Sequence, residues 1–195
     1  MPASTISQLK QLTRRLTVDH DLDSFSQQHR LAAVLILVYP GPEGLNIILT
    51  RRSDALPTHA GQISFPGGSV AEADPDPVHT ALREANEEIR LESSAVEILG
   101  VLDVTVLPSG FAVAPVLAVV ESEPQLAANP EEVDEIFSIP LQVVADLAQY
   151  RTDTLERDGI QREFWYLEYQ GRYIWGATAK MLRTLAVLLQ EELQR

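Results

Sequence analysis

The sequence contains no cysteine, which excludes a disulfide framework, a thiolate metal site and a cysteine nucleophile. Basic residues are also scarce, because 15 lysines and arginines stand against 28 acidic residues and give a formal net charge of −13. This balance argues against non-specific nucleic-acid binding, which needs a basic surface. An acidic protein that binds an anionic substrate must therefore supply metal ions or a local basic patch.

Long hydrophobic runs are missing as well. The longest, residues 31–39, is too short to span a bilayer, and the N-terminal segment lacks the apolar core of a signal peptide. Together with the absence of cysteine, this favours a cytoplasmic protein without membrane association. A length of 195 residues with 45% hydrophobic residues predicts one globular domain.

The most informative stretch is residues 67–91. A helix is predicted to begin near Pro75 or Pro77, because proline fits the first helical turn, and Asp74 or Asp76 can cap it. Its apolar stripe consists of Val78, Leu82, Ala85 and Ile89.

Three carboxylates, those of Glu84, Glu87 and Glu88, lie off this stripe within about one helical turn. Like charges at this spacing destabilise a helix by roughly 0.2–0.5 kcal/mol per pair. Beside the turn at residues 66–68, they indicate a site for hard divalent cations, which prefer oxygen ligands. A plain solvated acidic helix face is the alternative.

Hydrophobic patterning predicts an α+β protein, with a mixed sheet covered by helices on both faces. Residues 31–50 are expected to form a hairpin with a loop of about six residues, and residues 164–175 a second hairpin. Helices are expected over residues 4–16, 140–147 and 177–194, and loops over 18–29 and 121–130. Strands are expected over 96–107 and 111–120, and Pro115 in the second strand indicates an edge or a bulge. Residues 131–136 form a short acidic segment.

The spacing from Gly68 through Asp74 to residues 83–88 (REANEE) resembles the Nudix box. Three departures exist: Asp74 replaces a glutamate, one extra residue precedes Arg83, and Arg90 stands where the box usually has glycine. The turn after the helix must therefore be made in another way.

Four further segments resemble the coenzyme A pyrophosphatase subfamily of Nudix hydrolases: residues 49–68, 98–116, 129–141 and 174–182. A departure is Pro57, where the subfamily usually has arginine. The resemblance implies the Nudix fold, an α/β/α sandwich around a mixed sheet, with residues 1 to about 29 as a helical extension of a single domain over residues 1–195. It also implies metal-dependent hydrolysis of the diphosphate of coenzyme A or its derivatives, giving 4′-phosphopantetheine and adenosine 3′,5′-bisphosphate. A homodimer is left open.

The same resemblance implies that Glu84, Glu87 and Glu88 bind Mg²⁺ or Mn²⁺, joined by a backbone carbonyl of the turn at Gly68. Arg83 is expected to support them by pairing with Asp74 or a glutamate of the box. The general base is left between three residues, Glu84, Glu132 and Glu135.

Substrate recognition is expected from residues 49–65, because this segment has no role in the metal chemistry common to the family. Arg51 and Arg52 form the only basic pair near it, and a substrate phosphate needs such cations on an acidic protein. His59 could contact a phosphate, transfer a proton or make a structural hydrogen bond. Trp175 is expected in the core or at an interface.

Two other functions are compatible with these residues. One is a Nudix pyrophosphatase for another nucleoside diphosphate derivative, and the other is a Nudix-fold binding module without catalysis. The intact set of three carboxylates argues against the binding module.

Overall fold

The computed structural model describes residues 5–18, 22–157 and 159–194. The helices are α1 (Ile6–Thr13), α2 (Asp23–Ser26), α3 (Pro77–Ile89), α4 (Leu141–Ala145) and α5 (Gly176–Leu193). One large sheet contains β1 (Arg30–Gly41), β2 (Gly44–Arg52), β3 (Ile63–Ser64), β4 (Gly67–Ser69), β5 (Glu97–Val101), β6 (Thr105–Val106), β7 (Phe111–Val119) and β8 (Val133–Pro140). A second sheet contains β9 (Arg151–Arg157), β10 (Ile160–Tyr169) and β11 (Arg172–Trp175).

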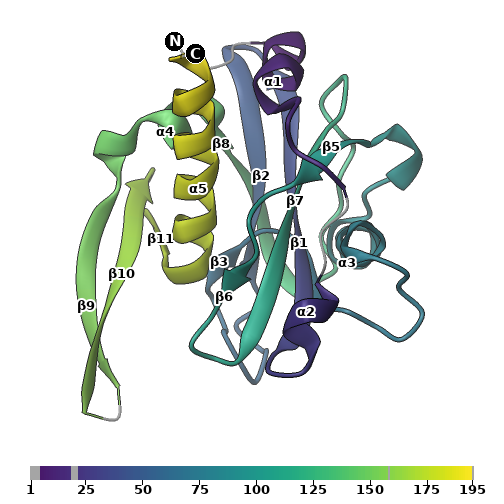
Figure 1. Ribbon diagram of the computed structural model, residues 1–195. Helices are drawn as coiled ribbons and strands as arrows, with labels where there is room; N and C mark the ends of the chain where they lie inside the picture. The colour runs from purple at the N-terminus through teal and green to yellow at the C-terminus, as the bar shows by residue number, and fades with distance from the viewer. Residues whose placement is uncertain (1–4, 19–21, 158, 195) are drawn as a thin grey trace.

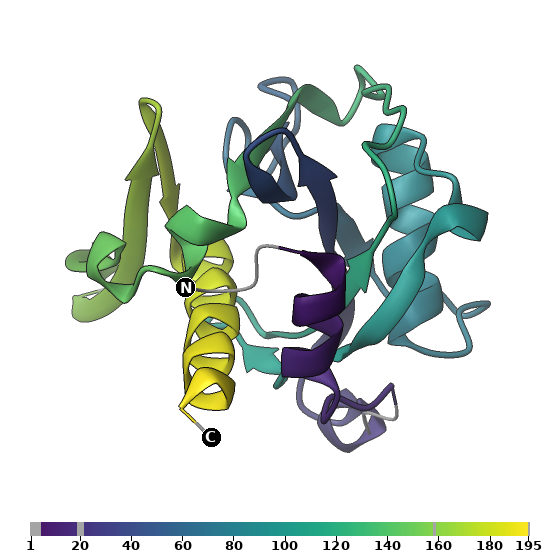
Figure 2. The ribbon, with the colours of Figure 1, turned by 90° about the horizontal axis from the view of Figure 1, so that it is seen from above.

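The large sheet is mixed and is organised around β1. This strand pairs antiparallel with β2 and β4 and parallel with β7, while β8 extends the sheet beyond β2. Figures 1 and 2 show α3 on one side of the sheet and α5 on the other. The predicted α/β/α sandwich is confirmed, and the second sheet is an addition to it.

Two hydrophobic clusters cover the two faces of the large sheet, because successive side chains of a strand point to opposite faces. In β1, Leu35 and Leu37 belong to the cluster that includes α3, whereas Ile36 and Val38 belong to the cluster that includes α5. All four side chains are fully buried. This explains why residues 31–39 read as a continuous apolar run rather than an alternating one.

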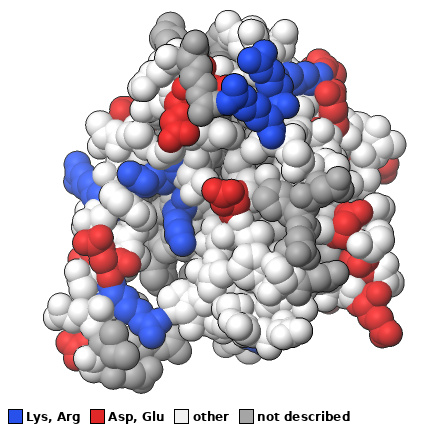
Figure 3. All heavy atoms as spheres, in the orientation of Figure 1, with Lys and Arg blue, Asp and Glu red and all other residues white. Residues whose placement is uncertain are grey.

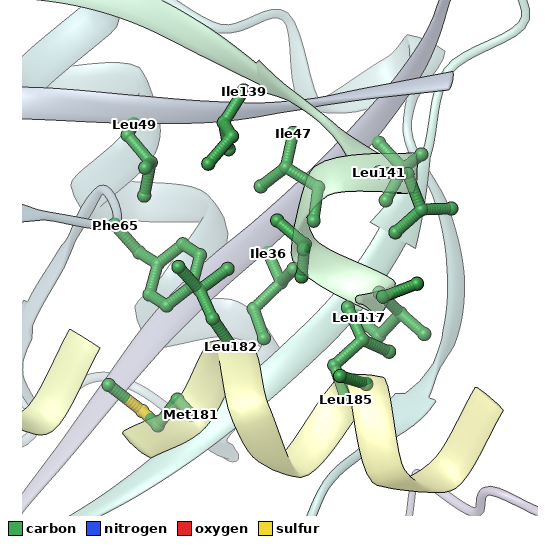
Figure 4. Packing of buried hydrophobic residues seen from close by; sticks show 14 of the residues in the cluster. Ile36, Ile47, Leu49, Phe65, Leu117, Ile139, Leu141, Met181, Leu182 and Leu185 are labelled. Atoms are coloured by element: carbon green, nitrogen blue, oxygen red, sulfur yellow. The ribbon is translucent and has the colours of Figure 1, made fainter. Parts of the chain in front are cut away.

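Helix α5 packs along the second of these faces. Leu182 and Leu185 project from it toward Ile36 and Leu117 of the sheet (Figure 4). Leu9 of α1 is buried in the same cluster, so this helix packs onto the face that α5 covers.

Several predicted boundaries are wrong. The first hairpin has a tight turn instead of a six-residue loop, because Gly41 pairs with Gly44. The strand expected over residues 96–107 is interrupted between β5 and β6, and the acidic segment 131–136 mostly belongs to β8. The loop expected over residues 18–29 contains the short helix α2, and residues 19–21 lie outside the described residues.

Pro115 lies in the interior of the sheet, since β7 pairs with β1 on one side and with β5 and β6 on the other. The edge alternative is therefore wrong. The pairing irregularity lies instead in the partner strand, between Ile98 and Gly100. The Pro115 carbonyl accepts a hydrogen bond from the N–H of Leu102, between β5 and β6. Among the described residues, no helix has both the length and the apolar character needed to cross a membrane.

Candidate metal centre and active site

The start of α3 is set by Asp76 and Pro77. Proline occupies the first turn, and the Asp76 side chain accepts a hydrogen bond from the N–H of His79 at 2.9 Å. Of the two starting points that the sequence allowed, the structure has the later one. Asp74 is therefore free for another role, described below with Arg83.

At the end of α3, Arg90 takes the backbone conformation that glycine usually takes in the Nudix box. Arg90 adopts the left-handed conformation with φ of 57°, and its N–H reaches the carbonyls of Ala85 and Asn86. The left-handed conformation costs a residue with a side chain roughly 1–2 kcal/mol. Asn86 stabilises the turn, because its side-chain amide donates to the carbonyl of Leu91 at 3.0 Å.

Glu88 is the most deeply buried carboxylate of the cluster, with only 2% of the residue exposed. Its Oε2 accepts a hydrogen bond from the N–H of Gly67 at 3.3 Å, and Arg52 Nη1 lies 3.7 Å from its Oε1. Burial raises the pKa of Glu88 to about 8, because removing a carboxylate from water penalises the charged form. A cation beside Glu88 would offset this penalty.

Glu84 lies against the glycine turn. A Cβ atom placed on Gly68 would lie 2.5 Å from Cδ of Glu84, so any larger residue at position 68 would displace the carboxylate. Burial raises the pKa of Glu84, and the neighbouring Glu87 and Glu132 act in the same direction. Gly68 thus permits the close approach of the backbone to the Glu84 carboxylate.

Arg83 holds the exposed side of the cluster together. Its guanidinium contacts Asp74 at 2.9 Å, Glu84 at 2.8 Å and Glu87 at 3.2 Å, and it donates to the carbonyl of Ser69 at 3.0 Å. The sequence offered Asp74 or a glutamate as its partner, and Arg83 pairs with both. The hydrogen bonds from Arg83 hold the pKa of Asp74 well below its usual range.

The two candidate bases outside the helix have different surroundings. Glu132 lies close enough to Glu84 and Glu88 to raise the pKa of both carboxyls, whereas Glu135 is ion-paired with Arg172. Asn129, which the sequence analysis missed, links Glu132 to α3. Its side-chain amide donates to Glu132 Oε1 at 3.1 Å, and its N–H donates to the Glu88 carbonyl at 2.8 Å. The signal for it was the Asn-Pro pair just before the acidic segment.

Arg51 and Arg52 are adjacent in sequence but have different partners, because neighbouring residues of a strand point to opposite faces. Arg51 pairs with Asp54 at 3.2 Å and Asp134 at 3.0 Å. Arg52 lies beside Glu88, and its buried Nε has no hydrogen-bond partner among the described residues. His59 is exposed, with Nδ1 2.9 Å from Gln62 Oε1.

The donor chemistry of the site fits a hard divalent cation. Oxygen ligands are available from Glu84, Glu87 and Glu88. Glu88 is buried and Glu84 is partly buried, and loss of water raises the pKa of both. Within the described part of the chain, no three acidic or histidine side chains already converge on one point as metal ligands would. Arg83 Nη1 contacts both Glu84 and Glu87, so cation binding requires these side chains to rearrange.

Comparison with known proteins agrees with this geometry. The sequence model of the NUDIX domain matches residues 29–158, which include β1, the glycine turn, α3 and the Glu132 loop. The chain belongs to the Nudix family. Nudix hydrolases generally use divalent metal ions such as Mg²⁺ or Mn²⁺.

Two curated relatives of this Nudix protein bear the name "Uncharacterized Nudix hydrolase NudL" and come from Yersinia pestis (strain Pestoides F) and Yersinia pseudotuberculosis (serotype O:1b, strain IP 31758). Each is 40% identical over 179 residues, which are 92% of this chain and 88% of the relative. The chain is therefore similar to these Nudix hydrolases over almost its whole length.

Two solved structures share the fold at lower identity. The Nudix hydrolase RenU from M. smegmatis superposes with a TM-score of 0.50 and 23% identity, over 61% of this chain and 74% of its own. A C. elegans Ap4A hydrolase superposes with a TM-score of 0.50 and 19% identity, over 60% of this chain and 85% of its own. These similarities support the Nudix fold.

Proposed function

We propose that this Nudix protein hydrolyses the diphosphate bond of coenzyme A or its derivatives, giving 4′-phosphopantetheine and adenosine 3′,5′-bisphosphate. The observation that carries the proposal is the buried carboxylate of Glu88, which lies with the partly buried Glu84 beside the glycine turn. A buried carboxylate such as that of Glu88 is costly for a folded protein unless a cation binds it. The resemblance of residues 49–68 to coenzyme A pyrophosphatases supports the choice of substrate.

Glu84, Glu87, Glu88 and the backbone carbonyl of Gly68 would hold Mg²⁺ or Mn²⁺. When bound, a divalent cation neutralises diphosphate oxygens, orients the substrate and lowers the pKa of water. Arg83 keeps Glu84 and Glu87 on one side of the helix through its ion pairs. Asp74 binds the same guanidinium and so helps to fix the position of Arg83.

Glu132 is the general base in this proposal. Asn129 holds Glu132 Oε1, which leaves Oε2 to accept a proton from the attacking water. The bond from the Asn129 N–H to the Glu88 carbonyl ties the base to the metal helix. Glu135 is less suitable, because Arg172 neutralises its charge.

Recognition of the substrate is assigned to the loop over residues 53–62. Its first residues are fixed to the segment that carries the base: the Ser53 N–H donates to the Glu132 carbonyl at 2.9 Å, and the Asp54 N–H donates to Asp134 at 3.1 Å. Arg51, paired with Asp54 and Asp134, stabilises this contact. Arg52 is the better phosphate ligand, because its partly exposed guanidinium lies beside Glu88 and is not held by two aspartates as that of Arg51 is. His59 lies further along the loop and is assigned a contact with the substrate.

A substrate comparison tests this function. Coenzyme A, dephospho-coenzyme A, ADP-ribose and diadenosine tetraphosphate are incubated with the full chain and Mg²⁺ or Mn²⁺, and the products are identified. Coenzyme A is expected to have the highest kcat/KM, by roughly tenfold to a hundredfold over dephospho-coenzyme A, since a charge-assisted phosphate contact is worth about 1.5–3 kcal/mol.

The arginines provide matched variants. Arg52→Ala should lower kcat/KM for coenzyme A and narrow its advantage, whereas Arg51→Ala should mainly lower the melting temperature. Equal rates on coenzyme A and dephospho-coenzyme A would assign the protein to a broader class of pyrophosphatases. No hydrolysis of any diphosphate would contradict a catalytic role.

A further inference from the structure

The three-stranded sheet carries an aromatic face that the proposed function does not use. Strands β9 and β10 extend away from the large sheet as an arm (Figures 1 and 2). Because opposite residues in an antiparallel pair share a face, Tyr166 and Trp175 lie on the same side, as do Phe164 two residues before Tyr166 and Tyr173 two residues before Trp175. We call this side the aromatic face.

The opposite face of this sheet is already covered. Leu167 and Ile174 are fully buried in the cluster that includes α5, and Arg183 of α5 lies 4.3 Å from the centre of the Trp165 ring. The aromatic face must therefore point away from α5.

The four rings contact one another instead of the core. Phe164 and Trp175 have their ring centres 5.3 Å apart, and Tyr166 and Tyr173 have theirs 4.9 Å apart. None of the four belongs to, or packs against, either hydrophobic cluster of the described chain. Tyr173 is 41% exposed, and Leu155, which lies opposite Arg162 in the register, is 49% exposed. Phe164, Tyr166 and Trp175 are partly buried. A cluster of partly exposed aromatic side chains outside the core is typical of the centre of a protein interface.

Charged residues of both signs flank the rings. The register places Arg151 opposite Tyr166, Asp153 opposite Phe164 and Glu168 opposite Tyr173, and Arg162 lies on the same face. The face therefore carries both basic and acidic residues, on a protein whose net charge is −13. Figure 3 has the orientation of Figure 1 and shows acidic and basic atoms near one another at the lower left, where β9 and β10 lie.

We propose that the aromatic face is a self-association surface whose occupant is the same face of a second copy of this chain. In a two-fold dimer a patch meets itself, so a patch of one sign would repel its copy, whereas a patch with both signs can pair arginine with carboxylate. Nucleic acid is disfavoured because it needs a basic surface. A small ligand is disfavoured because a sheet face offers no concave site.

Sedimentation equilibrium of the full chain tests this proposal at concentrations up to about 100 µM, well above the micromolar range of a weak standard-size interface. The wild type should have twice the mass of one chain. Tyr173→Glu and Leu155→Glu should each raise the dimer dissociation constant at least about thirtyfold, as expected for a central interface residue. Val106→Glu is the control, because Val106 is a 40% exposed apolar residue on β6, outside the aromatic face.

Circular dichroism and the melting temperature establish that each variant is folded. Leu155→Glu carries the test if Tyr173→Glu fails to fold, since Leu155 is the more exposed of the two. A wild type that stays monomeric throughout the concentration range overturns the proposal. So does a folded Tyr173 variant that dimerises as tightly as the wild type.

Discussion

Helices α3 and α5 cover opposite faces of one sheet, but they bury different kinds of side chain. α5 buries large apolar side chains such as Leu182, Leu185 and Leu189. α3 buries the small residues Ala81 and Ala85, and with them a carboxylate, Glu88. The first face gains stability from packing, and the second gives up stability to hold charge close to the sheet. The side of the sheet covered by α3 therefore holds the buried charge that the proposed chemistry needs.

The largest expected effect follows from removing the charge of Glu88. Glu88→Gln should lower kcat by about a thousandfold while the fold is retained, because a metal ligand is lost but the shape and the Gly67 hydrogen bond can persist. Glu92→Gln, at an exposed glutamate just beyond α3, should keep the wild-type rate. Steady-state kinetics and circular dichroism measure both properties. An unfolded Glu88→Gln protein would show that the carboxylate is structural.

The converse change on α5 should affect stability alone. Leu185→Ala deletes a fully buried side chain and should cost about 2–5 kcal/mol in the free energy of unfolding. Leu188→Ala, at a partly exposed position on the same helix, should cost less. Urea denaturation measures both losses, and kcat of the folded fraction should stay at the wild-type value. A hundredfold loss of kcat in Leu185→Ala would show that the face covered by α5 also contributes to catalysis, which contradicts the comparison.

The pH dependence of stability should separate the two helices further. In chelator, the pKa of Glu88 is about 8 in the folded protein against an ordinary value of 4.5. Between these pH values the folded chain holds a proton that the unfolded chain has lost, so the stability that Glu88 contributes falls as pH rises. The loss should be on the order of a few kcal/mol, since a tenfold change in an ionisation constant is worth about 1.4 kcal/mol. Urea midpoints of the metal-free wild type should therefore decrease from pH 5 to pH 8, and those of Glu88→Gln should decrease less.

The smallest effect is expected at the glycine turn. Gly68→Ala places a methyl group 2.5 Å from the Glu84 carboxyl carbon, so the carboxylate must move. The expected loss is about tenfold in kcat, because a small displacement of a reacting group is costly. Ser69→Ala adds no atom at the same turn and should be close to wild type. Wild-type kinetics in Gly68→Ala would show that the position of Glu84 is not critical.

The sequence predicted α3 and its three glutamates well, because helical spacing and the proline near its start are local properties. It did not reveal that Glu88 is buried while Glu87 is half exposed. That difference depends on Arg52 of β2 and Gly67 of β4, which contact Glu88 although they are 36 and 21 residues away from it along the chain.

Other sequence predictions were wrong or missing where a neighbouring strand determines the local structure. Residues 131–136 looked like a solvated acidic segment, yet most of them form β8 because β2 offers a free edge. β9 was missed because its polar sequence shows no buried face, and it is a strand only through pairing with β10. Arg51 and Arg52 were treated as one basic pair, although strand alternation alone was enough to predict their separation.

Mn²⁺ binding tests the central claim, that α3 gives up stability to hold a divalent cation, most directly. Electron paramagnetic resonance of free Mn²⁺, at about pH 8, gives the dissociation constants of the wild type, Glu88→Gln and the control Glu92→Gln. The wild type and Glu92→Gln should bind Mn²⁺ equally, and Glu88→Gln at least about tenfold more weakly. Equal binding by the wild type and a folded Glu88→Gln would contradict the account.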